Sequence, residues 1–166
     1  LDFFLPLNLP RKNQIITIGN LRWQKDHETL IKAFNIFLKT YPEYRLLIIG
    51  DGEERAKLEN LIKKLCIEDK VDLSGRKSQD QVLKELNNSK FFVLSSVTEG
   101  MPKALIEALA TNTPSVVTNV GSCKLIIEGA GYSVEHSDPT ELSKAMIEMI
   151  ENEKKYNEFY YKQEKT

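Results

Sequence analysis

Short apolar runs alternate with helical segments along most of the sequence, and this alternation restricts the fold more than any other feature. Residues between the runs repeat at helical spacing, as at Leu30, Phe34, Phe37 and Tyr41. Strands that alternate with helices in this way form β-α-β units, so we expect an α/β fold, a doubly wound parallel sheet of about six strands with helices on both faces. The predicted strands are 14–19, 45–50, 71–74, 91–95, 115–118 and 131–134.

Composition excludes several classes of protein. The chain has 166 residues, of which 28% are charged and 41% hydrophobic, as expected for one globular domain. Its net charge of −1 argues against a dedicated nucleic-acid binder, which would carry a basic excess. Cys66 and Cys123 share no motif spacing and are interpreted as reduced thiols of a cytosolic protein, while His27 and His136 are too scattered to predict a metal site. No run is long enough to span a bilayer, and no signal peptide is visible.

The most informative stretch runs from the apolar strand at 91–95 into the helix that follows it. Pro102 suits the first turn of that helix, which we expect to end near Ala110. Glu99 then lies on the connecting loop, and Glu107 lies within the helix as the sole charge between Ala104 and Asn119. An exposed helix glutamate is the ordinary alternative. In a segment this apolar we favour a partly buried carboxylate that faces a ligand, because a buried charge needs partners.

Parallel sheets bind ligands outside the carboxyl ends of their strands. Four of the five loops at that edge have glycine within two residues of the strand end, and the fifth has Gly100 beside Glu99. Simple turn chemistry explains any single glycine, but together they indicate a cleft into which a ligand fits closely. Lys25 could reach a phosphate there, although on its spacing alone a solvated surface lysine is the better interpretation. Acidic residues at 51–53 are better explained by a turn and a helix start than by a metal site.

Two common nucleotide-binding motifs are absent from the sequence. It contains neither the G-x-x-x-x-G-K-[ST] phosphate loop nor a G-x-G-x-x-G fingerprint after the first strand, which disfavours a plain dinucleotide oxidoreductase. A Ser/His/Asp or Cys/His arrangement is not apparent either.

A resemblance to one family covers about 14–150. Two glutamates separated by seven residues, Glu99 and Glu107, form its most specific part when taken with the order of the surrounding segments. The other matching stretches are 18–25, 30–34, 47–52, 71–75 and 114–121. On these residues the chain resembles the C-terminal, donor-binding domain of the family 4 glycosyltransferases, which have the two-domain GT-B fold. The resemblance implies a Rossmann-like domain whose ligand is a nucleoside diphosphate sugar, bound without a metal or other cofactor.

The resemblance also implies roles for individual residues. Lys25 and Glu99 would be catalytic: Lys25 neutralises the departing diphosphate, and Glu99 contacts hydroxyls of the donor sugar. Glu107 would hold the ribose hydroxyls, and the backbone N–H groups of Ala104 and Leu105 would bind the diphosphate. The full set of implied donor-binding residues is Gly19, Asn20, Lys25, Gly75, Arg76, Glu99, Gly100, Met101, Pro102, Ala104, Leu105 and Glu107, with Gly75 and Arg76 near the base.

Several positions depart from the family pattern and bear on the identity of the donor. Asn20 stands where arginine is common, and Arg22 is a substitute only at a different spacing. Asp26 replaces a common glycine, Ser122 replaces the second glycine of a later loop, and Leu125 stands where glutamate is frequent.

The expected organisation is an interdomain linker at 1–12, the donor domain at 13–152 and a tail at 153–166 that forms a helix packed on something outside this sequence. The acceptor site and a catalytic histidine belong to the family's N-terminal domain, so we expect a retaining glycosyltransferase of which this chain alone is inactive. Polysaccharide, lipopolysaccharide or glycoconjugate synthesis is the expected setting, in the cytoplasm or peripherally at the inner face of the membrane. A nucleotide-sugar epimerase of the same architecture and a non-catalytic nucleotide-binding module are the alternatives.

Overall fold

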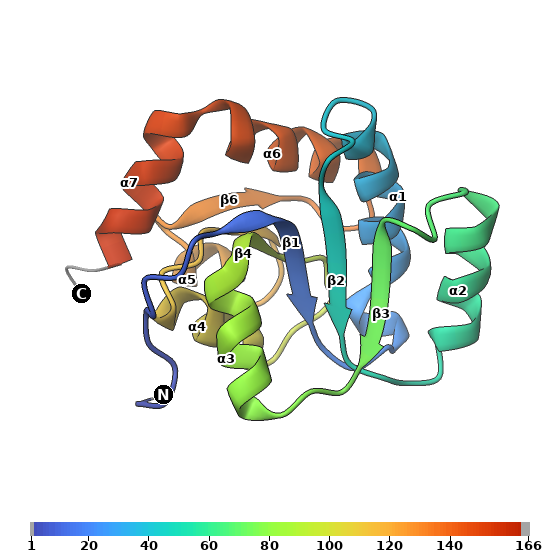
Figure 1. The fold of residues 1–166 in the computed structure, drawn as a ribbon, viewed down its shortest axis with the longest axis horizontal. Helices are drawn as coiled ribbons and strands as arrows, with labels where there is room; N and C mark the ends of the chain where they lie inside the picture. Colours follow the sequence, from blue (N-terminus) through green and yellow to red (C-terminus); the bar gives the residue numbers. More distant parts are fainter. Residues whose placement is uncertain (1, 164–166) are drawn as a thin grey trace.

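The computed structural model describes residues 2–163, with side chains as far as Tyr161. Its centre is a six-stranded parallel sheet in the order β3-β2-β1-β4-β5-β6 (Figure 1). The strands are β1 (Lys12–Ile18), β2 (Arg45–Ile49), β3 (Val71–Gly75), β4 (Ser89–Leu94), β5 (Ser115–Thr118) and β6 (Gly131–Val134). The helices are η1 (Trp23–Lys25), α1 (His27–Leu38), α2 (Arg55–Lys64), α3 (Gln79–Asn88), α4 (Lys103–Ala110), α5 (Cys123–Ile126), α6 (Pro139–Glu151) and α7 (Glu153–Gln163). The predicted fold class is confirmed.

Alternate residues of each central strand serve the two faces of the sheet. Ile15, Ile48 and Val93 join a core formed with α1, α2, α6 and α7. Their neighbours Ile16 and Ile49 join a second core formed with α3, α4 and α5. Because strand side chains alternate with a period of two, apolar residues at every position of a central strand indicate burial on both faces. Helices therefore cover both faces of the sheet (Figure 1).

Helix boundaries follow the capping residues that the sequence carries. Asp26 accepts a hydrogen bond from the Thr29 N–H and begins α1. Ser78 and Gln81 form the predicted capping box at the start of α3, and Asp138 caps α6. Two local expectations need correction. Pro102 precedes α4 instead of lying in its first turn, and the short helix expected near 125–128 lies at Cys123–Ile126.

The segment predicted as a linker packs on the domain within its described part. Phe4 is buried in the second core, and the Leu7 N–H donates to Asn87 Oδ1. Arg11 is half-buried and donates hydrogen bonds to main-chain carbonyls at the ends of α3 and α4, where helix dipoles favour a cation. Its backbone acceptors are Leu86, Ser89, Thr111 and Asn112. β1 begins at Lys12, inside the predicted linker.

The C-terminal helix packs on this chain, a contact that the sequence analysis did not predict. Tyr156 and Phe159 are buried in the first core, and the Tyr156 hydroxyl donates to the Lys90 carbonyl at 2.6 Å. Tyr160 stacks under the Arg11 guanidinium at 5.3 Å. The two ends of the described chain therefore meet through Arg11 and α7. The last three residues of the predicted tail, 164–166, lie outside the described residues.

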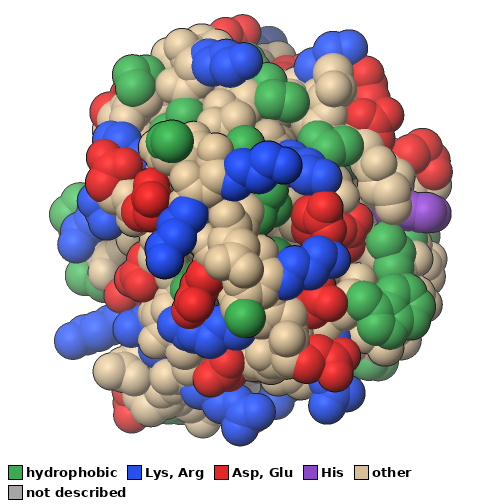
Figure 2. Space-filling model, turned by 90° about the vertical axis from the view of Figure 1, so that its right-hand side faces the viewer, with side chains coloured by type: hydrophobic (Ala, Val, Ile, Leu, Met, Phe, Trp, Pro, Cys, Tyr) green, Lys and Arg blue, Asp and Glu red, His purple; other side chains and the backbone are tan. Residues whose placement is uncertain are grey.

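Charges of both signs are interspersed over the face that carries α2 (Figure 2). Within residues 2–163, none of the helices combines the length and apolar character that a membrane crossing requires.

Candidate functional site

The strand order reverses direction between β1 and β4, and the loops that follow these two strands part at that point. β2 and β3 extend the sheet on one side, whereas β5 and β6 extend it on the other. Ligands of open α/β sheets bind in the crevice outside the carboxyl ends of the strands at such a reversal. The loop after β1 carries Lys25, and the loop after β4 carries Glu99, so both predicted catalytic residues lie at the reversal.

Two glycines at this edge let neighbouring loops touch each other. A β-carbon on Gly50 would lie 2.0 Å from the Gly19 carbonyl oxygen, and one on Gly121 would lie 2.8 Å from the Glu99 carbonyl oxygen. Both residues also have positive φ angles, 142° and 53°. Gly75 and Gly100 have open space where a β-carbon would stand. The close packing of loops fixes the backbone that carries Lys25 and Glu99.

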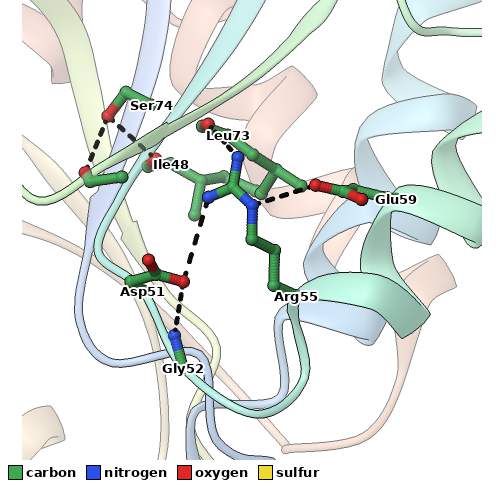
Figure 3. Close-up of polar contacts among 8 residues, drawn as sticks. Ile48, Asp51, Gly52, Arg55, Glu59, Leu73 and Ser74 are labelled. Atoms are coloured by element: carbon green, nitrogen blue, oxygen red, sulfur yellow. Dashed lines mark hydrogen bonds and ion pairs between the residues drawn. The ribbon is translucent and has the colours of Figure 1, made fainter.

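The loop after β2 is anchored by Arg55, as Figure 3 shows. Its guanidinium donates to Glu59 at 2.9 Å and to the Leu73 carbonyl at 3.0 Å, and lies 3.9 Å from Asp51. Asp51 in turn accepts a hydrogen bond from the Gly52 N–H. Asp51 therefore holds the turn before α2, as the sequence interpretation expects, although the first turn of α2 itself has no acidic residue.

η1 and the turn after it place Lys25. Ser95, at the end of β4, donates to the carbonyls of Lys25 and Asp26. Asp26 has φ 47°, a left-handed conformation that favours glycine and is tolerated here because its short side chain hydrogen-bonds locally. Burial, together with the nearby Lys25, lowers the pKa of His27 to about 4, so its imidazole is neutral at pH 7. The hydrogen bonds of Ser95 connect the loop after β1 to the end of β4.

Glu99 is enclosed and already paired. Its side chain is 4% exposed, and its Oε1 lies 2.6 Å from Lys25 Nζ. Ser96 donates its hydroxyl hydrogen to the same oxygen at 2.5 Å, and Thr118 fixes Ser96 by donating to its carbonyl at 2.6 Å. Sequence reasoning missed Ser96. A serine three residues before a glutamate in a loop does not by itself indicate a hydrogen bond between the two side chains.

Glu107 is also buried, as predicted, but its surroundings differ from those of Glu99. Its side chain is 12% exposed, and its nearest ion-pair partner among residues 2–163 is Lys103 at 3.8 Å. Desolvation raises the pKa of Glu107, and Lys103 opposes this shift only in part. The first turn of α4 adds the N–H groups of Ala104 and Leu105, which have no acceptor within the helix. An anion is favoured at such a helix start.

These groups surround one cavity of about 430 Å³. Six of the predicted donor-binding residues other than Lys25 line it, namely Gly19, Asn20, Arg76, Met101, Ala104 and Glu107. The predicted residues Gly75, Glu99, Gly100, Pro102 and Leu105 are not among its lining residues. Leu105 is fully buried in the second core, so its side chain is unavailable to a ligand. Glu99 lies behind Lys25, which lines the cavity and pairs with it.

Two further cations line the cavity that sequence reasoning did not single out, Lys77 and Lys103. With Lys25 and Arg76 they give four cationic side chains around one carboxylate, Glu107. Arg22, which the sequence offers as a substitute for the arginine missing at Asn20, is not among the lining residues. The four cationic residues are spread along the sequence, because Lys25, Arg76 and Lys103 follow three different strands. The sequence alone therefore did not show that they form one group.

Comparison with known proteins agrees with this architecture. The family model described as "Glycosyl transferases group 1" matches residues 4–166. An uncharacterized glycosyltransferase of Haemophilus influenzae is 34% identical over 145 residues, which are 86% of this chain and 40% of that protein. The chain spans only a quarter to two fifths of the length of the first curated relatives it matches.

Solved structures share the fold. The C-terminal domain of a glycosyl transferase group 1 family protein from Francisella tularensis superposes with a TM-score of 0.84 at 21% identity, over 96% of this chain and 91% of that one. A pneumococcal O-GlcNAc transferase gives a TM-score of 0.86 at 20% identity, over 96% of this chain and 33% of that one. Since the family model covers nearly the whole sequence, this chain belongs to the group 1 glycosyl transferases.

Proposed function

We propose that this chain is the donor-binding domain of a retaining, metal-independent glycosyltransferase and that its ligand is a nucleoside diphosphate sugar. The observation that carries the proposal is the cavity in which four cationic side chains meet the first turn of α4. A chain with a net charge of −1 has no general basic excess, so cations that gather at one helix start favour a local anionic ligand.

The neighbouring chemistry favours a nucleotide over a simple anion. Glu107 lies beside the cations with its carboxylate largely unpaired, and a carboxylate accepts hydrogen bonds from two vicinal hydroxyls such as those of ribose. The diphosphate would lie between Lys25 and the N–H groups of Ala104 and Leu105, and Lys25 would neutralise it as it leaves. The pneumococcal relative was solved in complex with UDP and GlcNAc, which supports a ligand of this class.

The acceptor, in this proposal, is held mainly by a part of the protein outside this chain. The stretches that align with this chain make up 25% and 40% of two curated relatives, so most of each relative lies outside the match. Transfer requires both substrates to be held together, so the chain alone would bind the donor without turning it over. The remaining proposals are a linker in the segment before β1, a cytoplasmic or inner-membrane location, and a role in polysaccharide, lipopolysaccharide or glycoconjugate synthesis.

A thermal-shift panel tests the proposal. UDP, GDP and ADP are compared with uridine, guanosine and adenosine. At about a hundred times its dissociation constant, one diphosphate should raise the melting temperature by roughly 5–10 °C, and its nucleoside should do so much less. Lys25→Ala should reduce the diphosphate shift and leave the nucleoside shift unchanged. If every diphosphate matched its nucleoside, the cavity would not be a diphosphate site and the proposal would fail.

A further inference from the structure

Lys25 and Glu99, which the donor-binding proposal assigns to different parts of the ligand, are bonded to each other in this structure. Lys25 Nζ lies 2.6 Å from Glu99 Oε1, with side-chain exposures of 29% and 4%. We propose that Glu99 and a bound diphosphate compete for Lys25, so that the site holds a nucleoside diphosphate sugar in preference to the free nucleoside diphosphate. This inference rests on the proposed function and makes Glu99 a determinant of specificity.

The protein holds Glu99 far more firmly than it holds Lys25. Ser96 donates to Glu99 Oε1, and Gly121 packs against the Glu99 carbonyl, so that two loops fix the glutamate. Lys25 lines the cavity, whereas Glu99 does not. When a ligand enters, the long and partly exposed lysine is therefore the partner that moves.

The two Glu99 oxygens are used unequally. Oε1 receives both Lys25 and Ser96, whereas Oε2 accepts no hydrogen bond from the described residues. A free diphosphate that draws Lys25 away leaves a nearly buried carboxylate without its counter-charge, which opposes binding. A sugar hydroxyl that donates to Glu99 compensates this loss, and only the sugar conjugate supplies that hydroxyl. The same ion pair therefore penalises the free diphosphate and spares the conjugate.

Calorimetric titrations of the purified chain test this competition. The probes are UDP, or GDP or ADP if it gives the largest thermal shift, together with its glucose and N-acetylglucosamine conjugates. Glu99→Gln keeps the shape of the side chain and an acceptor for Ser96, but it removes the charge. We expect it to bind the free diphosphate about tenfold more tightly than the wild-type chain does and to lose the preference for a conjugate.

Glu99→Asp separates competition from simple repulsion. It keeps the negative charge but is one methylene shorter, so it breaks the 2.6 Å contact with Lys25. Competition predicts tighter binding of the free diphosphate in this variant too, whereas repulsion by a nearby charge predicts no gain. A gain in Glu99→Gln alone would overturn the inference.

Asp51→Asn is the matched control. It removes a carboxylate from the same edge of the sheet, at a residue that pairs with Arg55 and not with Lys25. We expect it to leave both affinities unchanged, and a gain equal to that of Glu99→Gln would overturn the inference.

If the wild-type chain bound none of the diphosphates, the proposed function would fail and the inference with it. If the wild type bound one but neither Glu99 variant tightened it, only the inference would fail. Circular dichroism confirms that each variant is folded.

Discussion

Glu99 lies on the connection after β4 and Glu107 lies in the helix that follows it, and their carboxylates have different surroundings. Glu99 has a lysine at 2.6 Å and a serine hydroxyl at 2.5 Å. Glu107 has only Lys103 at 3.8 Å among the described residues, and burial raises its pKa. Both side chains are mostly buried, so exposure does not distinguish them.

The difference shows how one loop both holds itself together and leaves a charge for a ligand. Lys25 and Ser96 both pair with Oε1 of Glu99, and the negative charge of Glu99 helps to position Lys25. Glu107 is desolvated without full compensation, which destabilises the ligand-free fold. Destabilised groups of this kind gather at functional sites, where a ligand supplies the missing partners.

The largest expected effect is on ligand binding by Glu107→Ala. Because this carboxylate lacks hydrogen-bond partners among the described residues, a ligand hydroxyl should depend on it. We expect the diphosphate and its sugar conjugate to bind about ten- to a hundredfold more weakly, measured by calorimetry. Glu43→Ala, an exposed site between α1 and β2, is the control that should change neither affinity. Undiminished binding by Glu107→Ala would remove Glu107 from the site.

A smaller effect is expected on stability from Glu99→Ala. This change leaves Lys25 and the buried Ser96 hydroxyl without their shared acceptor. We expect the free energy of unfolding to fall by about 1–2 kcal/mol, measured by urea denaturation of the ligand-free chain. Asp51→Asn, which removes a more exposed carboxylate, should change it by less than about 0.5 kcal/mol. Equal losses would mean that the Lys25 pair adds nothing to the fold.

The smallest effect is a gain in stability from Glu107→Gln, and its sign depends on pH. A raised pKa means that the folded state binds the Glu107 proton more tightly than the unfolded chain does. Glu107 therefore opposes folding above its raised pKa, and this cost disappears as the pH falls below the ordinary value of 4.5. We expect Glu107→Gln to be more stable than the wild type at pH 7, by less than about 1 kcal/mol.

Urea denaturation at pH 7 and at pH 4 measures that gain, which should shrink at the lower pH. Glu99→Gln should show no such gain, since its carboxylate is paired. A loss of stability in Glu107→Gln at pH 7 would show that the fold satisfies Glu107 after all.

Much of the fold was predictable because it depends on local patterns. Apolar runs such as 45–50 mark strands buried on both faces, and Asp26, Ser78 and Asp138 mark helix starts by the hydrogen bonds they offer. Each of these signals acts over a few residues, so the sequence displays it directly. The partial burial of Glu107 was predictable for the same reason, since its helix is apolar on nearly every side.

Contacts between distant segments were not predictable in this way. The helix at Glu153–Gln163 has weak periodicity, and only the folded chain brings Tyr156 to the Lys90 carbonyl. The segment before β1 shows no period either, although Arg11 reaches the ends of two helices. Both segments pack on the domain because their side chains bind groups that other elements supply.

The sequence by itself determined which elements form, where most of them begin, and that one glutamate lies on the connection after β4 and another in the helix that follows. Only the tertiary structure decided what each glutamate meets. Lys25 and Glu99 are 74 residues apart, and they pair because β1 and β4 are neighbours in the sheet and their loops leave the same edge. Side-chain periodicity reports the face on which a residue lies. The position of its partner depends on strand order and on the path of the loops, which no local pattern encodes.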